Sequence, residues 1–397
     1  MSAATQERYV TSLASIVVLA AFGLLGNLAA VILPIVVGSL MDSGLSAVQV
    51  GYAEAADMVG IAVGALLWSR LILRVNWRLA ALCAIPIAIA GNIICALMPT
   101  FGPVMGGRAM SGLGSGLLAA IGSAGLSQTR RPERAFGLAS TANMVAAAGL
   151  VYMFTFVSHR AGSAAVFGGI ASIFMAMALM LKWLPERPPE ARLRTAEPAV
   201  DSSSHASAIP WRFAGLALAG IWAYFIAAMV FWTYVERIAV AAGFSTTFLA
   251  RSLGIGQLMG ACGALTTAVL ASYFRRRLAP VAGYIVLATC AAMIFTTQPH
   301  PWLFFAAVCM LFFSWSGVYP YFIGTVVALD PAARLVSLTI TISFIGKSMA
   351  PPVAAYLARG SDYTLAYCFS AVFFVISLAL MLVPLLHAER AGNQGRK

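Results

Sequence analysis

The chain has little charge. Of its 397 residues only 10% are charged, while 61% are hydrophobic and the mean hydropathy is +0.89. Ordinary soluble domains carry about 25% charged residues, so this composition excludes a soluble globular protein and predicts an integral membrane protein. The net charge of +12 does not indicate nucleic-acid binding, because no basic domain stands apart from the apolar runs. We therefore expect no nucleic-acid partner.

Groups that carry enzyme chemistry are also scarce. The four histidines lie on separate segments, no Cys-x-x-Cys pair occurs, and all six cysteines lie inside apolar runs. A dinucleotide-binding loop follows a strand, but the glycines of 112–116 and 254–256 lie inside apolar runs with no predicted strand before them. There is no Walker A sequence either. We expect no enzyme, metal site or cofactor, and an ion gradient rather than ATP as energy source.

What the sequence does contain is a series of long apolar runs. Each is long enough for a helix to cross a hydrocarbon core of about 30 Å. The twelve predicted spans are residues 13–38, 47–69, 79–98, 102–127, 135–157, 163–184, 213–240, 246–272, 279–297, 302–327, 335–358 and 364–387. The expected fold class is an all-α membrane protein with twelve transmembrane helices.

The basic residues between these runs indicate an orientation. If both termini are cytoplasmic, the inner connections hold most of the arginines, and the outer connections keep only Arg160 and Arg359. This asymmetry follows the positive-inside rule. We expect a multi-pass protein of the bacterial inner membrane with both termini in the cytoplasm.

A polar segment rich in proline and serine, 185–211, divides the runs into halves 1–184 and 212–397. The halves resemble one another at an offset of about 200 residues, in the manner of transporters built from internal repeats. For example, Gly64-Ala65-Leu66 matches Gly263-Ala264-Leu265. We expect a cytoplasmic linker between two pseudo-symmetric six-helix bundles, which rock about a site at the membrane midplane.

Two motifs connect the chain with a family. Arg108-Ala-Met-Ser-Gly-Leu-Gly-Ser-Gly116 and Arg131-Pro-Glu-Arg-Ala-Phe-Gly137 resemble the fourth helix and following cytoplasmic turn of the major facilitator superfamily. The resemblance implies a secondary transporter that works by alternating access as a symporter or antiporter. Leu73 stands where the family's loop motif has an acidic residue, and 144–156 lacks the glycine-proline pattern of its drug antiporters. The second departure weighs against an exporter.

Four ionisable residues lie inside predicted spans: Glu54, Asp57, Arg108 and Lys347. Each costs at least about 2.5–3.5 kcal/mol unless it is paired, so such residues are functional by default. We expect Lys347 to pair with Asp57 or Glu54 across the halves in one conformation, and proton or substrate binding to break the pair. The alternative is a permanent structural pair. Arg108 attracts a substrate anion, orients a proton-carrying group, or is structural.

Aromatic residues at spacings of three and four follow the predicted seventh and tenth helices. If these stripes face a cavity they suit an aromatic solute; alternatively they face lipid. The candidate substrate or coupling residues are, with the four above, Asn27, Trp232, Glu236, Trp315 and Tyr319. Asn27 binds substrate or bridges helices. The candidate gate residues, which are otherwise merely solvated, are Arg74 and Arg78 at the inner side and Arg237 and Arg251 at the outer side.

Together these features predict a secondary transporter of a small organic solute, and Arg108 and Lys347 favour an amphipathic organic anion. Proton coupling would run through Asp57 or Glu54. The first alternative is a proton-driven exporter of hydrophobic drugs or metabolites, and a membrane-embedded enzyme or channel is the alternative from another class. The expected partners are the substrate, protons and the lipid bilayer, and the expected state is a monomer.

Overall fold

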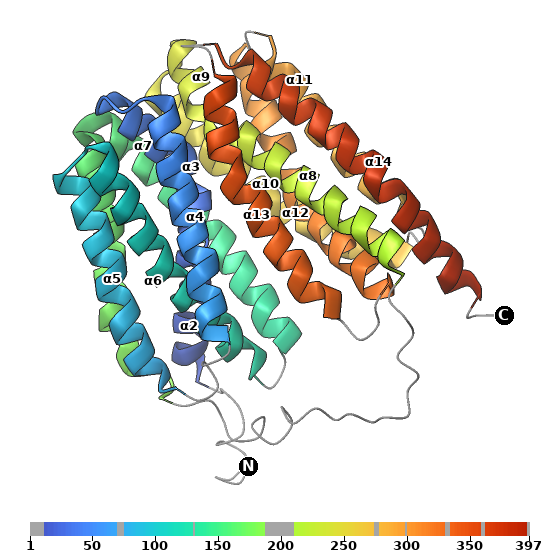
Figure 1. Cartoon of the computed structure of the whole chain (residues 1–397), viewed down its shortest axis with the longest axis horizontal. Coiled ribbons are helices and arrows are strands. Elements are labelled where there is room, and N and C mark those ends of the chain that lie inside the picture. The colour runs from blue at the N-terminus through green and yellow to red at the C-terminus, as the bar shows by residue number, and fades with distance from the viewer. Residues whose placement is uncertain are drawn as a thin grey trace. The chain divides into compact units, whose positions relative to one another are not determined.

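A computed structural model gives the fold of residues 12–69, 75–129, 132–186, 210–273, 278–297, 300–329, 334–358 and 362–394. These residues form helices joined by short connections (Figure 1). The helices are α2 Leu13–Leu25, α3 Leu28–Asp42, α4 Ala47–Ser69, α5 Trp77–Leu97, α6 Phe101–Ser127, α7 Pro132–Leu179, α8 Trp211–Thr233, α9 Val235–Ala241, α10 Thr246–Tyr273, α11 Leu278–Phe295, α12 Pro301–Leu329, α13 Arg334–Leu357 and α14 Thr364–Gln394, with a short 3-10 turn, η1, at Leu181–Trp183.

The helices follow the predicted apolar runs. Nine of the described helices are long and apolar enough to cross a membrane, or ten if the pair α2 and α3, bent by 42°, is one span. Helix α7 covers two predicted runs, and Gly162 with φ 69° breaks it between them. Helix α13 covers the predicted run 335–358. The all-α membrane fold expected from the sequence is confirmed.

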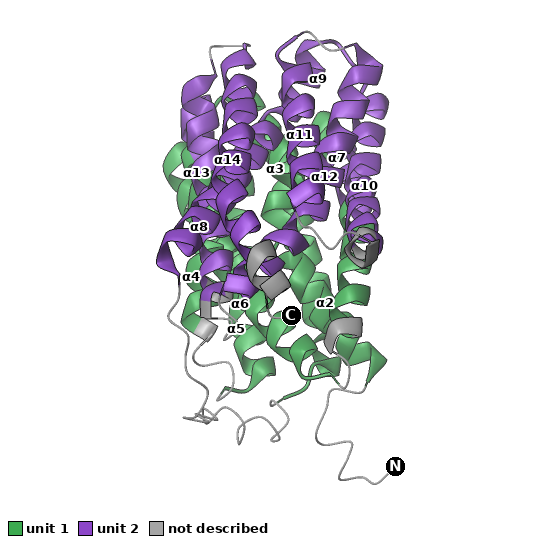
Figure 2. Ribbon diagram, turned by 90° about the vertical axis from the view of Figure 1, so that its right-hand side faces the viewer, with its two compact units in different colours: residues 1–45, 52–147, 157–205 green, residues 46–51, 148–156, 206–397 purple. Residues whose placement is uncertain are grey.

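The chain forms two compact units (Figure 2). Unit 1 comprises residues 1–45, 52–147 and 157–205, and unit 2 comprises residues 46–51, 148–156 and 206–397. The short segments 46–51 and 148–156 thus group with unit 2, although they precede the predicted linker. Because residues 187–209 lie outside the described part, the boundaries 184/185 and 211/212 stay a prediction.

Glycines bring the helices of unit 1 into backbone contact. A Cβ atom at Gly112 or Gly116 of α6 would collide with the carbonyl groups of Asp57 or Ile61 of α4. Gly60 and Gly64 of α4 meet the backbone of α6 in the same way. Stripes of small residues permit such close approach between membrane helices. The glycines of α6 therefore let α4 approach to backbone contact.

Aromatic rings fill the interior of unit 2. Tyr224 of α8 lies with its ring centroid 5.4 Å from that of Phe322 of α12 and 5.2 Å from that of Phe374 of α14. The hydroxyl groups of Tyr224 and Ser314 are 2.9 Å apart, and Ser314 donates a hydrogen bond of 2.6 Å to the carbonyl of Tyr284. Helix α8 is therefore held in unit 2 by both ring contacts and buried hydrogen bonds.

Candidate functional site

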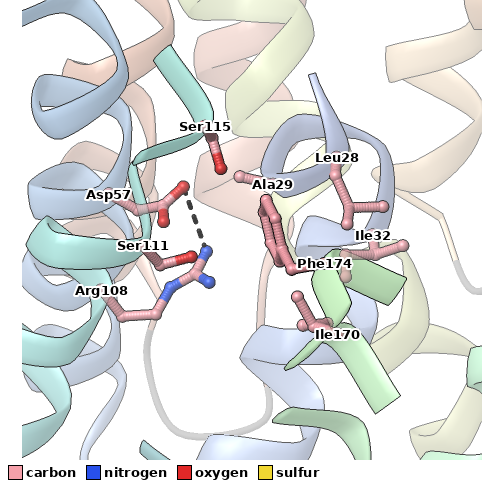
Figure 3. Close-up of a pocket in the computed structure, with 9 residues that line it drawn as sticks. All are labelled: Leu28, Ala29, Ile32, Asp57, Arg108, Ser111, Ser115, Ile170 and Phe174. Atoms are coloured by element: carbon pink, nitrogen blue, oxygen red, sulfur yellow. Dashed lines mark ion pairs between the residues drawn. The ribbon is translucent and has the colours of Figure 1, made fainter. Parts of the chain in front are cut away.

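Unit 1 contains an ion cluster of three buried side chains, Glu54 and Asp57 of α4 and Arg108 of α6. Arg108 Nη2 donates a hydrogen bond of 2.8 Å to Glu54 Oε2 and lies 3.3 Å from Asp57 Oδ2. None of the three side chains is more than 2% exposed. Figure 3 shows the guanidinium and the Asp57 carboxylate pointing toward one another.

The sequence explains how these side chains meet. Glu54 and Asp57 are three residues apart, so they lie on one face of α4. The backbone of Gly112 is in contact with the Asp57 carbonyl, and Arg108 lies four residues before Gly112 on the same face of α6. The close contact of the two helices therefore carries the guanidinium directly to the two carboxylates.

The charges of the ion cluster do not balance. It holds two carboxylates against one guanidinium, which is always charged. Glu54 Oε1, Asp57 Oδ2 and Arg108 Nε have no hydrogen-bond partner among the described residues. One proton bound by a carboxylate brings the net charge to zero, which removes the penalty of an uncompensated buried charge. The chain's own acids thus supply the counter-charge of Arg108, and its predicted roles in anion attraction, proton orientation or structure stay predictions.

Unit 2 contains an aromatic site around Lys347 of α13. The Lys347 ammonium lies 5.0 Å from the ring centroids of Phe225 and Phe344 and 5.7 Å from that of Trp315. The Phe225 ring is in edge contact with both Trp315 and Tyr319. Within the described residues no carboxylate forms an ion pair with Lys347. Three aromatic rings therefore lie within reach of this cation for cation–π attraction.

Helix spacing assembles the aromatic site from three elements. Trp315 and Tyr319 are four residues apart on α12, and Phe344 precedes Lys347 by three on α13. Trp315, Tyr319 and Lys347 were predicted from the sequence, whereas Phe344 was not, although the same spacing rule applies to it. The predicted pairing of Lys347 with Asp57 or Glu54 stays a prediction for another conformation, since in this one the two acids contact Arg108.

Other candidate residues have local roles. Trp232 is buried against Phe312, with their ring centroids 4.8 Å apart. Glu236 is buried, and its Oε2 lies 3.6 Å from Nε of the adjacent Arg237. Exposed Asn27 lies at the break between α2 and α3 and donates a hydrogen bond of 3.2 Å to the Gly23 carbonyl. None of these residues joins the ion cluster or the aromatic site.

Among the predicted gate residues, Arg78 has well-defined partners in unit 1. It donates hydrogen bonds to the carbonyls of Leu184 at 2.6 Å and Lys182 at 2.9 Å, and to Glu186 Oε1 at 2.8 Å. A cation at the carbonyl end of a helix is stabilising, so Arg78 ties the end of η1 to α5. Arg251 is exposed, and Arg74 lies outside the described residues. The gate roles stay predictions.

Comparison with known proteins identifies the fold. The family model described as Major Facilitator Superfamily matches residues 12–346. Among curated proteins, none matches the sequence. The described part of the chain shows no group of three His, Cys, Asp or Glu side chains that could hold a metal ion.

Several solved structures have the same fold. A crystal structure of a D-xylose–proton symporter is 14% identical, covers 93% of this chain and 96% of that one, and has a TM-score of 0.73. The inward-open xylose transporter XylE from E. coli is 15% identical over 91% and 94% of the chains, with a TM-score of 0.66. FucP in its outward conformation is 17% identical over 93% and 98%, with a TM-score of 0.57. At these identities the likeness concerns the fold alone.

Proposed function

This chain belongs to the major facilitator superfamily, and we propose that, as a secondary transporter, it moves an amphipathic organic anion such as an aromatic carboxylate together with protons. Its membership of this family makes it a multi-pass membrane transporter rather than an enzyme. The proposal further includes a location in the bacterial inner membrane, cytoplasmic termini and a monomeric state.

The observation that carries the anion proposal is the environment of Lys347. Its ammonium lies among the rings of Phe225, Trp315 and Phe344, with no carboxylate partner in the described part of the chain. A cation among aromatic rings keeps only part of its hydration, and the carboxylate of a substrate would supply a counter-charge. The rings would then pack against the apolar body of the same molecule. A neutral sugar would provide no counter-charge.

The ion cluster supports the proton part of the proposal. Its excess carboxylate can take up one proton and release it again without leaving Arg108 unpaired. A monovalent organic anion that enters with one proton adds no net charge. Proton binding at the ion cluster and anion binding at the aromatic site would therefore allow electroneutral uptake. The exporter of lipophilic cations is disfavoured by the same geometry, because Lys347 would repel a cation at the aromatic site.

Uptake by the purified chain in proteoliposomes tests this function. With the outside acidic, we expect saturable uptake of labelled aromatic carboxylates, and counterflow when the vesicles are preloaded with the same compound. Lys347→Met should reduce this uptake by more than about tenfold, which corresponds to the loss of about 1.4 kcal/mol of binding. Lys347→Arg should retain part of it. Arg212→Met, which removes an exposed cation at the start of α8, is the matched control.

The competing functions give different results in the same assay. Uptake of neutral sugars that does not change in Lys347→Met would contradict the anion proposal. Resistance of cells to lipophilic cations without carboxylate uptake would favour the exporter. Flux that neither saturates nor shows counterflow would indicate a channel.

A further inference from the structure

A small pocket lies beside the ion cluster in unit 1. It encloses about 220 Å³ of empty space, including its open mouth. One wall consists of Asp57, Arg108, Ser111 and Ser115, and the opposite wall is apolar, with Ile32 of α3 and Phe174 of α7 (Figure 3). Because the volume of about 220 Å³ includes open solvent, the enclosed part suits a molecule the size of water rather than an organic substrate.

Two polar atoms of this wall make no hydrogen bond within the described structure, although one of them, Asp57 Oδ2, lies in the ion pair with Arg108. Asp57 Oδ2 and Arg108 Nε are buried and make no hydrogen bond with any described residue. Buried polar groups are nearly always satisfied, either by protein or by ordered water. A buried water needs a cavity large enough for one water molecule and two to four polar groups to which it can hydrogen-bond. The pocket meets both conditions.

Asn92 of α5 orients the Ser111 hydroxyl, which also lines the pocket. Its Nδ2 donates hydrogen bonds to Ser111 Oγ at 2.9 Å and to the Ala88 carbonyl at 2.8 Å. Because Ser111 Oγ accepts from Asn92, its own O–H is left to donate elsewhere. Figure 3 shows the Ser111 oxygen and the Asp57 carboxylate on the same wall of the pocket.

We propose that the pocket binds one ordered water between Ser111 and Asp57 Oδ2, and that this water is the last carrier of the proton that reaches Asp57. Asn92 is a positioning residue, which acts through Ser111. A hydronium at this position gives one proton to Oδ2 and leaves a neutral water and a carboxylic acid, and release runs in the opposite direction. The transport step rests on the proton coupling proposed above, whereas the water site does not depend on it.

Other ionisable groups adjoin this carrier. Glu54 and Arg108 belong to the ion cluster, and Cys95 of α5 is buried with its thiol 3.6 Å from the Val104 carbonyl. The apolar wall of α3 and α7 contributes no ionisable side chain to the pocket. Among the described residues around the pocket, the two carboxylates are therefore the groups that can accept the proton.

Hydroxyl-radical footprinting by X-ray radiolysis tests the water site directly, because bound water is the radical source next to buried side chains. In the purified chain we expect oxidation of Phe174 and Ile32, although each is only 1% exposed. Ser111→Ala should lower their oxidation by about threefold or more, since the water loses one of its two to four partners. Ser39→Ala is the matched control, because this buried hydroxyl bonds only to the Val36 carbonyl of its own helix. Absence of oxidation in the wild type would overturn the water site whatever the protein transports.

Transport measurements test the proton step. Net proton-driven uptake requires Asp57 to gain and lose a proton, whereas exchange of substrate for substrate does not. In Ser111→Ala we expect net uptake to fall about tenfold, equivalent to about 1.4 kcal/mol on the barrier, with exchange nearly unchanged. In Asn92→Ala we expect the same pattern to a smaller degree, with a smaller fall in net uptake and exchange again nearly unchanged. Equal losses of uptake and exchange would mean a merely structural role for Ser111 and would reject the proton step.

The occupant itself is also tested. If Na⁺ at constant pH suppresses the oxidation of Phe174, a small metal cation fills the pocket and the water proposal is wrong. If the oxidation responds to Ser111→Ala as expected but transport proves independent of protons, the water site stands and the proton coupling fails.

Discussion

Each unit carries a cation on one of its long helices, Arg108 on α6 and Lys347 on α13, but the two cations are stabilised in opposite ways. Arg108 in unit 1 is surrounded by acids of its own chain, Glu54 and Asp57, and all three are buried. Lys347 in unit 2 is surrounded by aromatic rings and is partly exposed. One cation is neutralised within the protein, and the other lacks a counter-ion in the described structure.

This difference follows from the chemistry of the two side chains. The planar guanidinium of arginine has several donors and remains charged when buried, which suits a permanent link between helices. The lysine ammonium is a compact charge on a flexible stem, and it can exchange one partner for another. We therefore assign proton binding to the acids around Arg108 and anion binding to Lys347. Four substitutions test these two assignments.

Arg108→Met should have the largest effect. It leaves two buried carboxylates without their cation, so we expect a loss of about 3–5 kcal/mol of stability. A thermal unfolding scan in detergent would show this as a large fall in apparent Tm. The triple variant Arg108→Met, Glu54→Gln, Asp57→Asn should recover most of the loss because no charge remains. A triple variant as unstable as the single one would show that the charge imbalance is not the cause.

Gly112→Ala should have the next largest effect. The added Cβ would meet the Asp57 carbonyl, so α4 and α6 must separate at a cost of about 1–3 kcal/mol. Gly106→Ala on the same helix has nothing within 4 Å of its Cβ and serves as control. Thermal unfolding of both variants checks this, and equal Tm values would show that the close contact does not hold the ion cluster together.

Trp315→Leu should weaken substrate binding in unit 2. Loss of one aromatic surface next to Lys347 should raise the KM for an aromatic carboxylate by about 2–10-fold, which corresponds to about 0.5–1.5 kcal/mol, with little change in maximal rate. The control is Trp302→Leu, since Trp302 at the start of α12 is 71% exposed. An unchanged KM in the Trp315 variant would remove that ring from the binding site.

Lys347→Met should have the smallest effect on stability, although we expect it to reduce anion uptake by more than about tenfold. It removes a cation without an acidic partner in the described structure, so we expect a change in stability within about 1 kcal/mol or a slight gain. The apparent Tm measures it directly beside Arg108→Met. A fall as large as that of the arginine variant would instead support the predicted pairing of Lys347 with Asp57 or Glu54.

The sequence identified the ionisable residues of both units but not their partners. Glu54 and Asp57 share a helical face because they are three residues apart, and that follows from local geometry. Their contact with Arg108 depends on which helix α4 touches at Gly60 and Gly64, and helix adjacency is not encoded in spacing along one helix. For the same reason the sequence does not indicate the partner of Ser111, since its contact with Asn92 joins two helices.

The sequence by itself determined that this chain is a bundle of membrane helices with charges that need partners. Hydrophobic run length and the cost of charge in lipid are local properties, so they can be derived residue by residue. Only the tertiary structure decided that Arg108 has two acids, that Lys347 has three rings, and that a small polar pocket lies beside Asp57. Those outcomes depend on the contacts between helices, where the position of one glycine determines which side chains meet.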